Sequence, residues 1–364
     1  MTHCPSRFAI VTALACLLYG APVALASDAA TPPPVTAAQT PHIALLLPMN
    51  SKLFGRHAAA LRDGFQAAAK TERQLQLPVR EYAVSDEVGN VLEGYRSAVA
   101  GGAQVVVGPL TRDAVTALAF GEPVPVPTLA LNVADNTGRI PGNLYMLSLQ
   151  VETEARQVAR FAWRENRRTA VTVSGGSPVQ RRMQTAFAGE FSRLGGKITG
   201  DLVFAAESDR LQAIGRAAAD ADMAFLALNF GETRAARAFL GNTPAYATSS
   251  VHIGEPGVLA GHDLAGVNFV DMPWLLESQH PAVMIYPRPK LQGAIDLERL
   301  YALGIDAWRI TQLLLAGVRE IRLDGVTGTL TLGPDGQFER GLVAARYIDG
   351  RPRVSNQGAR ESAR

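Results

Sequence analysis

Polar side chains and glycines stand at the ends of several short apolar segments, and they are the residues of this chain best suited to chemistry. They offer amides, hydroxyls, a carboxylate and close approach of the backbone to a ligand. With their neighbours Met49 and Pro109, the candidate residues for a ligand-binding cleft are Met49, Asn50, Ser85, Asp86, Gly108, Pro109, Asn132, Asn229, Thr248 and Ser249. Such groups suit hydrogen bonding to a small polar ligand, but they include no activated nucleophile. The alternative is that they cap helices and shape turns, which use the same residue types.

The sequence lacks the familiar catalytic patterns. It contains no G-x-S-x-G elbow, no H-E-x-x-H pair and no G-x-x-x-x-G-K-[ST] loop. Its histidines do not stand at metal-ligand spacing from carboxylates or from one another. We therefore expect no catalytic residues, no metal, no cofactor and a protein that is not an enzyme.

Short apolar segments alternate along the chain with amphipathic helical ones. Ile43–Leu47 is an unbroken apolar run ended by Pro48, and Ala58, Leu61 and Phe65 follow at helical spacing. Four such strand–helix units precede Gln150, and a second series of similar size follows it. This order predicts an α/β fold with two lobes, each a parallel sheet flanked by helices, that face each other across a cleft.

The predicted boundaries follow from this alternation. We expect lobe 1 at 42–149, with a return segment at about 273–325 that carries a strongly amphipathic helix. We expect lobe 2 at 150–272, with a C-terminal hairpin at about 326–349 that turns at Pro334-Asp335-Gly336. The polar composition of 351–364 predicts a disordered tail.

The first residues have the pattern of an export signal. A positive charge and an apolar run precede Ala24-Leu25-Ala26, which predicts a signal peptide at 1–26 cleaved between Ala26 and Ser27. A Pro/Ala-rich tether follows at 27–41. The alternative is lipidation at Cys16, because the residues before it loosely resemble a lipobox. The expected location is the soluble periplasm, or, with lipidation, the outer membrane facing the periplasm.

The overall charge excludes two classes of partner. The formal net charge is +2, with 19% charged residues. Nucleic-acid binders and membrane-surface proteins usually carry clustered basic charge, so we expect no nucleic acid and no membrane contact unless the chain is lipidated.

Six short motifs, correctly ordered, resemble those of the penicillin-binding protein activator (LpoA/LppC) family in its C-terminal domain. They are Leu45–Met49, Val107–Leu110, Leu129–Asn132, Tyr246–Ser249, Asp271–Leu276 and Leu300–Ala307. The resemblance spans about 43–350 and implies a type I periplasmic-binding fold with three crossovers. It also implies a non-enzymatic regulator, anchored to the outer membrane, that binds a class A penicillin-binding protein (a peptidoglycan synthase) and stimulates its transpeptidase activity.

Two features depart from that family. Its long members carry an N-terminal helical-repeat domain, where this sequence has only a short tether. They are also typically lipidated, whereas the leader of this sequence favours ordinary cleavage after Ala26. The first hypothesis is therefore an activator of cell-wall synthesis, and the alternative is a periplasmic solute-binding protein that feeds a transporter. In the alternative, Thr248, Ser249 and amides near Gly108 would hold the carboxylate of an amino acid or similar small polar ligand, and Asp86 its ammonium.

Overall fold

The computed structural model describes residues 39–72, 77–135, 138–254, 258–289, 291 and 295–355. The predicted signal peptide, its cleavage point between Ala26 and Ser27, and Cys16 lie outside these residues, as does most of the predicted tether. None of the helices within the described residues is both long enough and apolar enough to cross a membrane.

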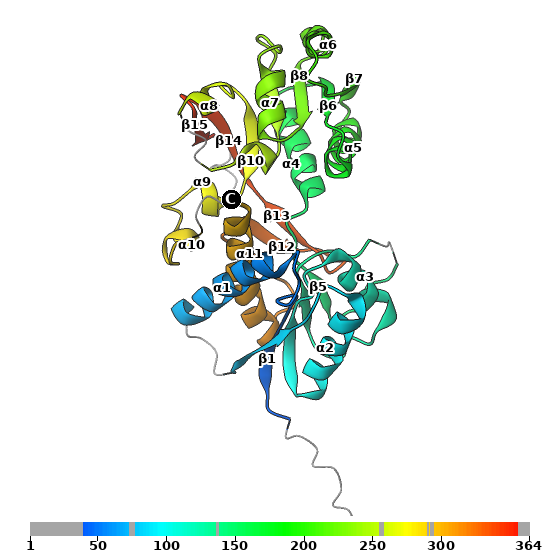
Figure 1. The fold of residues 1–364 in the computed structure, drawn as a ribbon, viewed down its shortest axis with the longest axis vertical. Coiled ribbons are helices and arrows are strands. Elements are labelled where there is room, and N and C mark those ends of the chain that lie inside the picture. Colours follow the sequence, from blue (N-terminus) through cyan, green and yellow to red (C-terminus); the bar gives the residue numbers. More distant parts are fainter. Residues whose placement is uncertain are drawn as a thin grey trace, which may run out of the picture. The chain divides into compact units, whose positions relative to one another are not determined.

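Lobe 1 is built on a five-stranded parallel sheet with the strand order β2-β1-β3-β4-β5. Its strands are β1 (His42–Leu47), β2 (Val79–Ala83), β3 (Ala103–Val107), β4 (Thr128–Ala130) and β5 (Leu144–Met146). Its helices are α1 (Gly55–Glu72), α2 (Val88–Ala100), α3 (Arg112–Gly121) and the late α11 (Ile295–Leu315). Figure 1 shows α1 and α11 on one side of this sheet and α2 and α3 on the other. Alternate residues of β1 pack on the two faces, Ile43 and Leu45 against α1 and α11, Ala44 and Leu46 against α2 and α3.

Lobe 2 is built on a seven-stranded sheet with the order β15-β14-β10-β9-β8-β6-β7. Its strands are β6 (Thr169–Ser174), β7 (Lys197–Val203), β8 (Met223–Ala227), β9 (Ala245–Ala247), β10 (Asn268–Asp271), β14 (Val343–Ile348) and β15 (Arg351–Val354). Helices α4 (Val151–Arg164) and α5 (Pro178–Arg193) cover one face. Helices α6 (Ser208–Ala219) and α7 (Phe230–Arg237) cover the other.

Short elements complete the chain around the return from lobe 2. They are the 3-10 turn η1 (Ser249–Val251), α8 (Val258–His262), α9 (Pro273–Leu276), α10 (Pro281–Met284), β11 (Arg322–Asp324), β12 (Thr329–Leu332) and β13 (Phe338–Gly341). The chain passes between lobes after β5, after β10 and between β13 and β14. The predicted two-lobed α/β fold with three crossovers is confirmed.

Two predictions about the C-terminal region are wrong. The expected hairpin forms, because β12 and β13 pair antiparallel, but it does not belong to lobe 2: β12 also pairs with β11 in a separate three-stranded sheet whose Leu330 and Phe338 join the lobe 1 core. The chain enters the lobe 2 sheet with β14, and the switch falls at Leu342. A single run of alternating residues carries no mark of a change of sheet, so the sequence pattern did not reveal it.

The disorder predicted from residue 351 is also wrong for Arg351–Val354. These residues form β15, which pairs antiparallel with β14. The turn between them contains Asp349 at φ 51° and Gly350 at φ 74°, a pair suited to a tight hairpin. Pro352 and Val354 are half-buried while Arg351 and Arg353 are exposed, so the polar composition hides an alternating strand.

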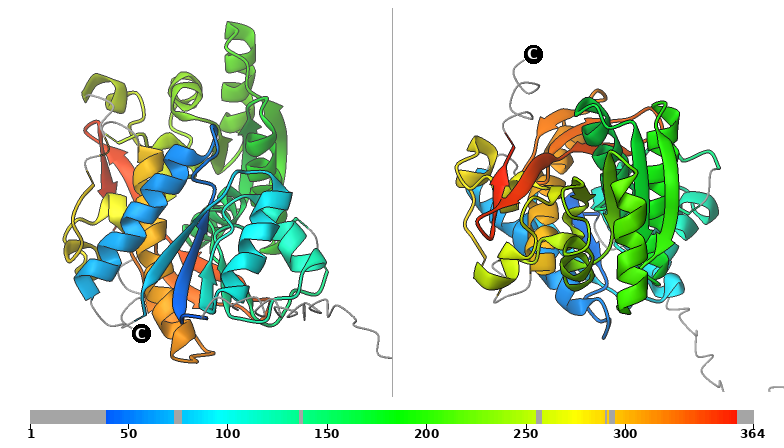
Figure 2. Two further views of the ribbon diagram at one scale, coloured as in Figure 1. Left: turned by 60° about the horizontal axis from the view of Figure 1, so that its bottom comes forward. Right: turned by 90° about the horizontal axis from the view of Figure 1, so that it is seen from above.

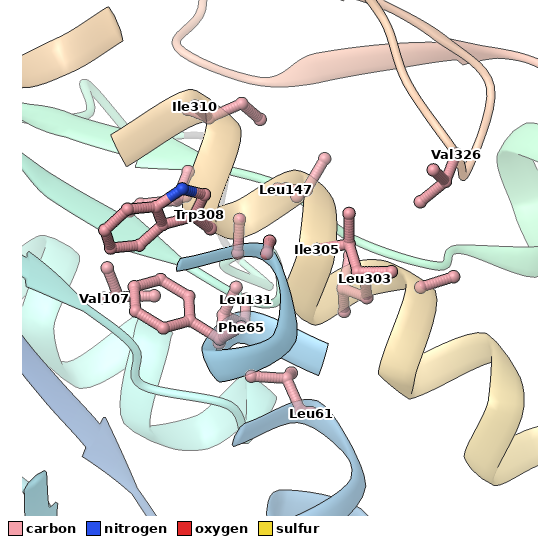
Figure 3. Close-up of a cluster of buried hydrophobic side chains, with 14 of the residues drawn as sticks. Leu61, Phe65, Val107, Leu131, Leu147, Leu303, Ile305, Trp308, Ile310 and Val326 are labelled. Atoms are coloured by element: carbon pink, nitrogen blue, oxygen red, sulfur yellow. The ribbon is translucent and has the colours of Figure 1, made fainter. Parts of the chain in front are cut away.

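Helices α1 (blue) and α11 (orange) lie side by side (Figure 2), and side chains of both, such as Phe65 and Trp308, enter one buried cluster (Figure 3). A Cβ added to Gly64 would lie 1.9 Å from the carbonyl oxygen of Tyr301, and one added to Gly304 would lie 2.0 Å from that of Leu61. Beside this contact the Phe65 and Trp308 rings meet edge to face, with centroids 5.2 Å apart. Neither glycine can carry a side chain unless the two helix backbones separate.

We predict that Gly304→Ala lowers the free energy of unfolding by at least about 2 kcal/mol, because overpacking of this kind forces backbone shifts. The measurement is urea unfolding followed by circular dichroism. Gly189→Ala is the matched control, since its Cβ meets nothing within 4 Å on α5. It should stabilise the protein by about 0.5–1 kcal/mol through helix propensity. Equal effects of the two substitutions would contradict the close helix crossing.

Candidate functional site

Four of the seven predicted site residues of lobe 1 line two separate open hollows at the carboxyl ends of its strands. The first has a volume of about 560 Å³ and is lined by Asn50 and Ser85, together with Asn90 and Ser97 of α2. Ser85 is already engaged there, because its hydroxyl accepts a hydrogen bond from the Asn90 amide at 2.8 Å. The Asn50 amide donates to the carbonyl of Ala83 at 3.2 Å.

The second hollow has a volume of about 490 Å³ and contains Asp86 and Asn132. Phe54, Leu110 and Leu300 give it an apolar wall, and His57, Thr111, Arg112 and Asp113 also line it. Asp86 is exposed and takes part in no hydrogen bond or ion pair among the described residues. The Asn132 amide donates to the carbonyl of Leu110 at 3.0 Å, so this side chain holds the wall of the hollow.

Met49, Gly108 and Pro109 shape the backbone beneath these hollows. Gly108 has φ 113°, and a Cβ there would lie 2.0 Å from the carbonyl oxygen of Leu46, so only glycine fits. The carbonyl of Pro109 accepts a hydrogen bond from the amide of Leu131 at 2.8 Å. These two residues are buried and Met49 is half-buried, which makes them supports of the strand ends.

The three predicted residues of lobe 2 are engaged internally, and neither hollow contains them. Asn229 caps α7 and forms a capping box with Glu232, as the alternative based on helix caps predicts. Thr248 is buried, and its hydroxyl accepts from the amide of Ser250 and contacts the Met183 sulfur. Ser249 donates its hydroxyl to Glu154 at 2.7 Å. The ten predicted residues therefore do not form one common pocket.

A buried ionic cluster joins the lobes at their crossovers. Asp271 lies at the end of β10, is 1% exposed, and contacts Arg299 of α11 at 2.9 Å and His252 at 2.8 Å. Arg299 also donates to the carbonyls of Ser249 at 3.1 Å and His252 at 3.0 Å. One guanidinium anchored in lobe 1 thus bonds three groups of lobe 2.

Glu154 of α4 forms the second half of this cluster. Its carboxylate accepts from both the hydroxyl and the amide of Ser249, the latter at 3.3 Å, and it pairs with Arg340 of β13 at 3.3 Å. Gln157, one helical turn further on, donates to the carbonyl of Arg340 at 2.6 Å and accepts from the amide of Leu342 at 2.9 Å. The side chains of α4 therefore hold the segment where the chain switches from β13 to β14.

The charges of the cluster balance, but its two acids respond differently to burial. Burial raises the pKa of Glu154, and Arg340 opposes this shift without cancelling it. Burial would also raise the pKa of Asp271, but Arg299 and His252 outweigh it and hold that pKa below its ordinary value. Arg299 keeps a raised pKa because its pairing with Asp271 overcomes the effect of its own burial.

Sequence reasoning missed Glu154, Arg299 and Arg340, although a signal for two of them exists. Glu154 falls on the apolar stripe of its helix with Val151 and Val158, and Arg299 falls on that of Leu303 and Ile310. A charge on an apolar stripe must find a partner when the helix packs. Asp306 is such a case: it is buried and accepts from the amides of Val326 at 3.0 Å and Thr327 at 2.7 Å, so it caps a turn.

The chemistry available to these residues is binding and support. The described residues contain no group of three or more metal-ligating side chains. His252 contacts Asp271 at one ring nitrogen, but no hydroxyl among the described residues hydrogen-bonds to it, so the pair activates no nucleophile there.

Two lobes, one with a parallel sheet and one with a parallel sheet extended by the antiparallel β14 and β15, are joined by three crossovers and have the fold of the type I periplasmic-binding class. Within that class the chain belongs to the LppC family, because the family model described as "LppC putative lipoprotein" matches residues 34–204 and 205–350. The penicillin-binding protein activator LpoA of Pectobacterium parmentieri is 26% identical over an alignment of 325 residues, and the match covers 75% of this chain and 47% of the relative. That of Edwardsiella piscicida is 28% identical over an alignment of 297 residues, and the match covers 68% of this chain and 42% of the relative. The chain spans about half the length of the curated relatives it matches.

Two solved structures have similar folds. One, described as a "putative branched-chain amino acid ABC transporter" of Chromobacterium violaceum, is 40% identical with a TM-score of 0.74, and the match covers 84% of this chain and 99% of that one. The other is the LpoA C-domain of Haemophilus influenzae, described as a regulator of PBP1A. It is 22% identical with a TM-score of 0.72 and coverage of 86% and 99%, and it shows the likeness of fold.

We predict that Asp271→Asn lowers the free energy of unfolding by about 3–5 kcal/mol, because it removes the buried counter-charge of Arg299 and leaves this guanidinium paired with the exposed Asp296. Asp263→Asn is the control, since Asp263 pairs with Arg234 on the surface and such pairs contribute below about 1 kcal/mol. Chemical unfolding of both variants at pH 7 makes the comparison. Because folding favours ionised Asp271, its contribution is present at neutral pH and is lost as the pH falls below about 4.

Proposed function

We propose that this chain is a non-enzymatic regulator in the periplasm that binds and stimulates a class A peptidoglycan synthase. The observation that carries the proposal is the match of the LppC family model across residues 34–350, together with relatives that are named penicillin-binding protein activators. The geometry supports a structural role for the polar residues nearest the crossovers, because they bond one another.

The same proposal includes a location. A regulator of cell-wall synthesis must act outside the cytoplasmic membrane, and the residues before Ser27 have the pattern of an export signal. We propose the soluble periplasmic form, with the Cys16-lipidated outer-membrane form as its alternative. Mass spectrometry of the N-terminus of the native protein distinguishes Ser27 from an acylated Cys16.

We predict that the purified chain retains a class A peptidoglycan synthase on an affinity resin and raises its rate of peptide crosslinking. The measurement is the crosslinked fraction of newly made peptidoglycan, with and without the chain. The control is a leucine-binding protein, which shares the fold class but belongs to a solute-uptake system. If the chain neither retains the synthase nor changes the crosslinked fraction, the proposed function fails.

A second candidate function rests on the hollow that contains Asp86. The 40% identical structure carries the name of an amino-acid transporter component, and this hollow combines an uncommitted carboxylate with an apolar wall. Those groups suit a small ligand with an ammonium group and an aliphatic side chain. Thr248 and Ser249 do not serve this ligand, because both are engaged inside lobe 2.

We predict for this candidate that a saturating aliphatic amino acid stabilises the chain against heat. A ligand at about 100 times its dissociation constant adds roughly 2.7 kcal/mol. Asp86→Asn should abolish the gain, whereas Glu87→Gln should keep it, because Glu87 is adjacent and exposed but does not line the hollow. A screen of the natural aliphatic amino acids without any stabilisation removes this candidate.

A further inference from the structure

Polar contacts tie together the three places where the chain crosses between the lobes. The first crossover leads into α4, whose Glu154 reaches Arg340, and the second begins at Asp271, which pairs with Arg299. The third lies between β13 and β14, where Gln157 bonds both Arg340 and Leu342. The first and third crossovers are therefore attached to each other, and the second is attached to α11 of lobe 1, in each case by a buried charge or amide.

Rotation of one lobe against the other would have to break these contacts. Hinged domains close when a few linking residues absorb changes in φ and ψ. Here such a change would separate Glu154 from Arg340 or Asp271 from Arg299. All four residues are largely buried. Separating such partners leaves uncompensated charges out of water, which is strongly unfavourable.

Glu154 also occupies hydrogen-bond donors that a ligand would otherwise use. Ser249 follows the end of β9, at the edge where this class of fold places its ligands. Its amide and hydroxyl point to the same carboxylate oxygen of Glu154. That arrangement of two donors around one oxygen is what an exogenous carboxylate needs. The chain thus supplies its own carboxylate at that strand end.

An ordinary intralobe ion pair provides a contrast. Glu190 of α5 pairs with Arg160 of α4 and Arg193, both within lobe 2 and both partly exposed. These contacts stabilise the packing of two neighbouring helices, and no motion between lobes would disturb them. Among the ion pairs of the described residues, only those of the cluster at the crossovers join elements of different lobes.

We propose that the Glu154–Arg340 and Asp271–Arg299 pairs lock the two lobes at one angle without any ligand, with Glu154 acting as a built-in substitute for a ligand carboxylate. The lock makes the protein a rigid scaffold whose surface is constant in the free state. A binding partner then meets one preformed arrangement and loses less conformational entropy on association.

The test measures the distance between two spin labels, one on each lobe, by double electron–electron resonance. No synthase is present, so the outcome is independent of the proposed function. The labels are attached through Gly121→Cys in lobe 1 and Arg216→Cys in lobe 2, both exposed, in a chain whose own Cys4 and Cys16 are replaced by serine. The lock variant is the double substitution Glu154→Gln with Arg340→Met. It removes both charges together, so that neither is left buried alone.

We expect one narrow distance population in the parent chain and a broadened or second population in the double variant. Glu190→Gln, the matched control within lobe 2, should leave the distribution unchanged. Circular dichroism and thermal melting of each variant show that the fold is retained. If the double variant does not fold, the single Glu154→Gln variant, which keeps an oxygen to accept from Ser249, takes its place. A broad distribution in the parent chain, or identical distributions in parent and lock variant, would overturn the proposal.

Discussion

The buried ion pair between Asp271 and Arg299 is the contact on which the arrangement of the crossovers depends. Its two partners lie on elements of different lobes. The guanidinium of Arg299 also donates to two backbone carbonyls, that of Ser249 in η1 and that of His252, the residue after η1. A buried pair of this kind is weak evidence for stability, because hydrophobic residues of similar volume often serve as well. Its value lies in geometry, since a charged hydrogen bond accepts few alternative arrangements.

The two most distinctive motifs of the sequence take their meaning from this region. In Asp271–Leu276, the aspartate pairs with Arg299. The guanidinium carbon of Arg288 lies over the Trp274 ring, 4.0 Å from the ring centre. In Leu300–Ala307, Gly304 permits the close approach of α1, and Asp306 caps the turn at Val326 and Thr327. Both motifs therefore describe how the chain returns from lobe 2 and docks on lobe 1. The residues of these two motifs therefore have structural roles.

Much of the fold follows from periodicity, because each lobe repeats one simple unit. Apolar runs such as Ile43–Leu47 and Met223–Ala227 become fully buried central strands, and the helices between them carry one apolar stripe. Prediction failed where a decision depends on a distant partner. The division of β13 from β14 is set by contacts with Gln157, and the site residues Thr248 and Ser249 are taken up by α5 and α4. Position at a strand end predicted where polar side chains would lie, but it did not reveal which of them hydrogen-bond to other side chains of the protein.

The crossing of α1 and α11 has a consequence for the order of folding. Gly64 and Gly304 are separated by 240 positions, and residues of lobe 2 fill most of the interval. One face of the lobe 1 sheet is covered by α1 and α11 together, so it stays partly uncovered until residues beyond 295 are present. Most of lobe 2 is continuous in sequence and needs only β14 and β15 to complete its edge. During synthesis, lobe 2 therefore has the more local contacts and is able to fold first, whereas lobe 1 is completed only when its last helix is present.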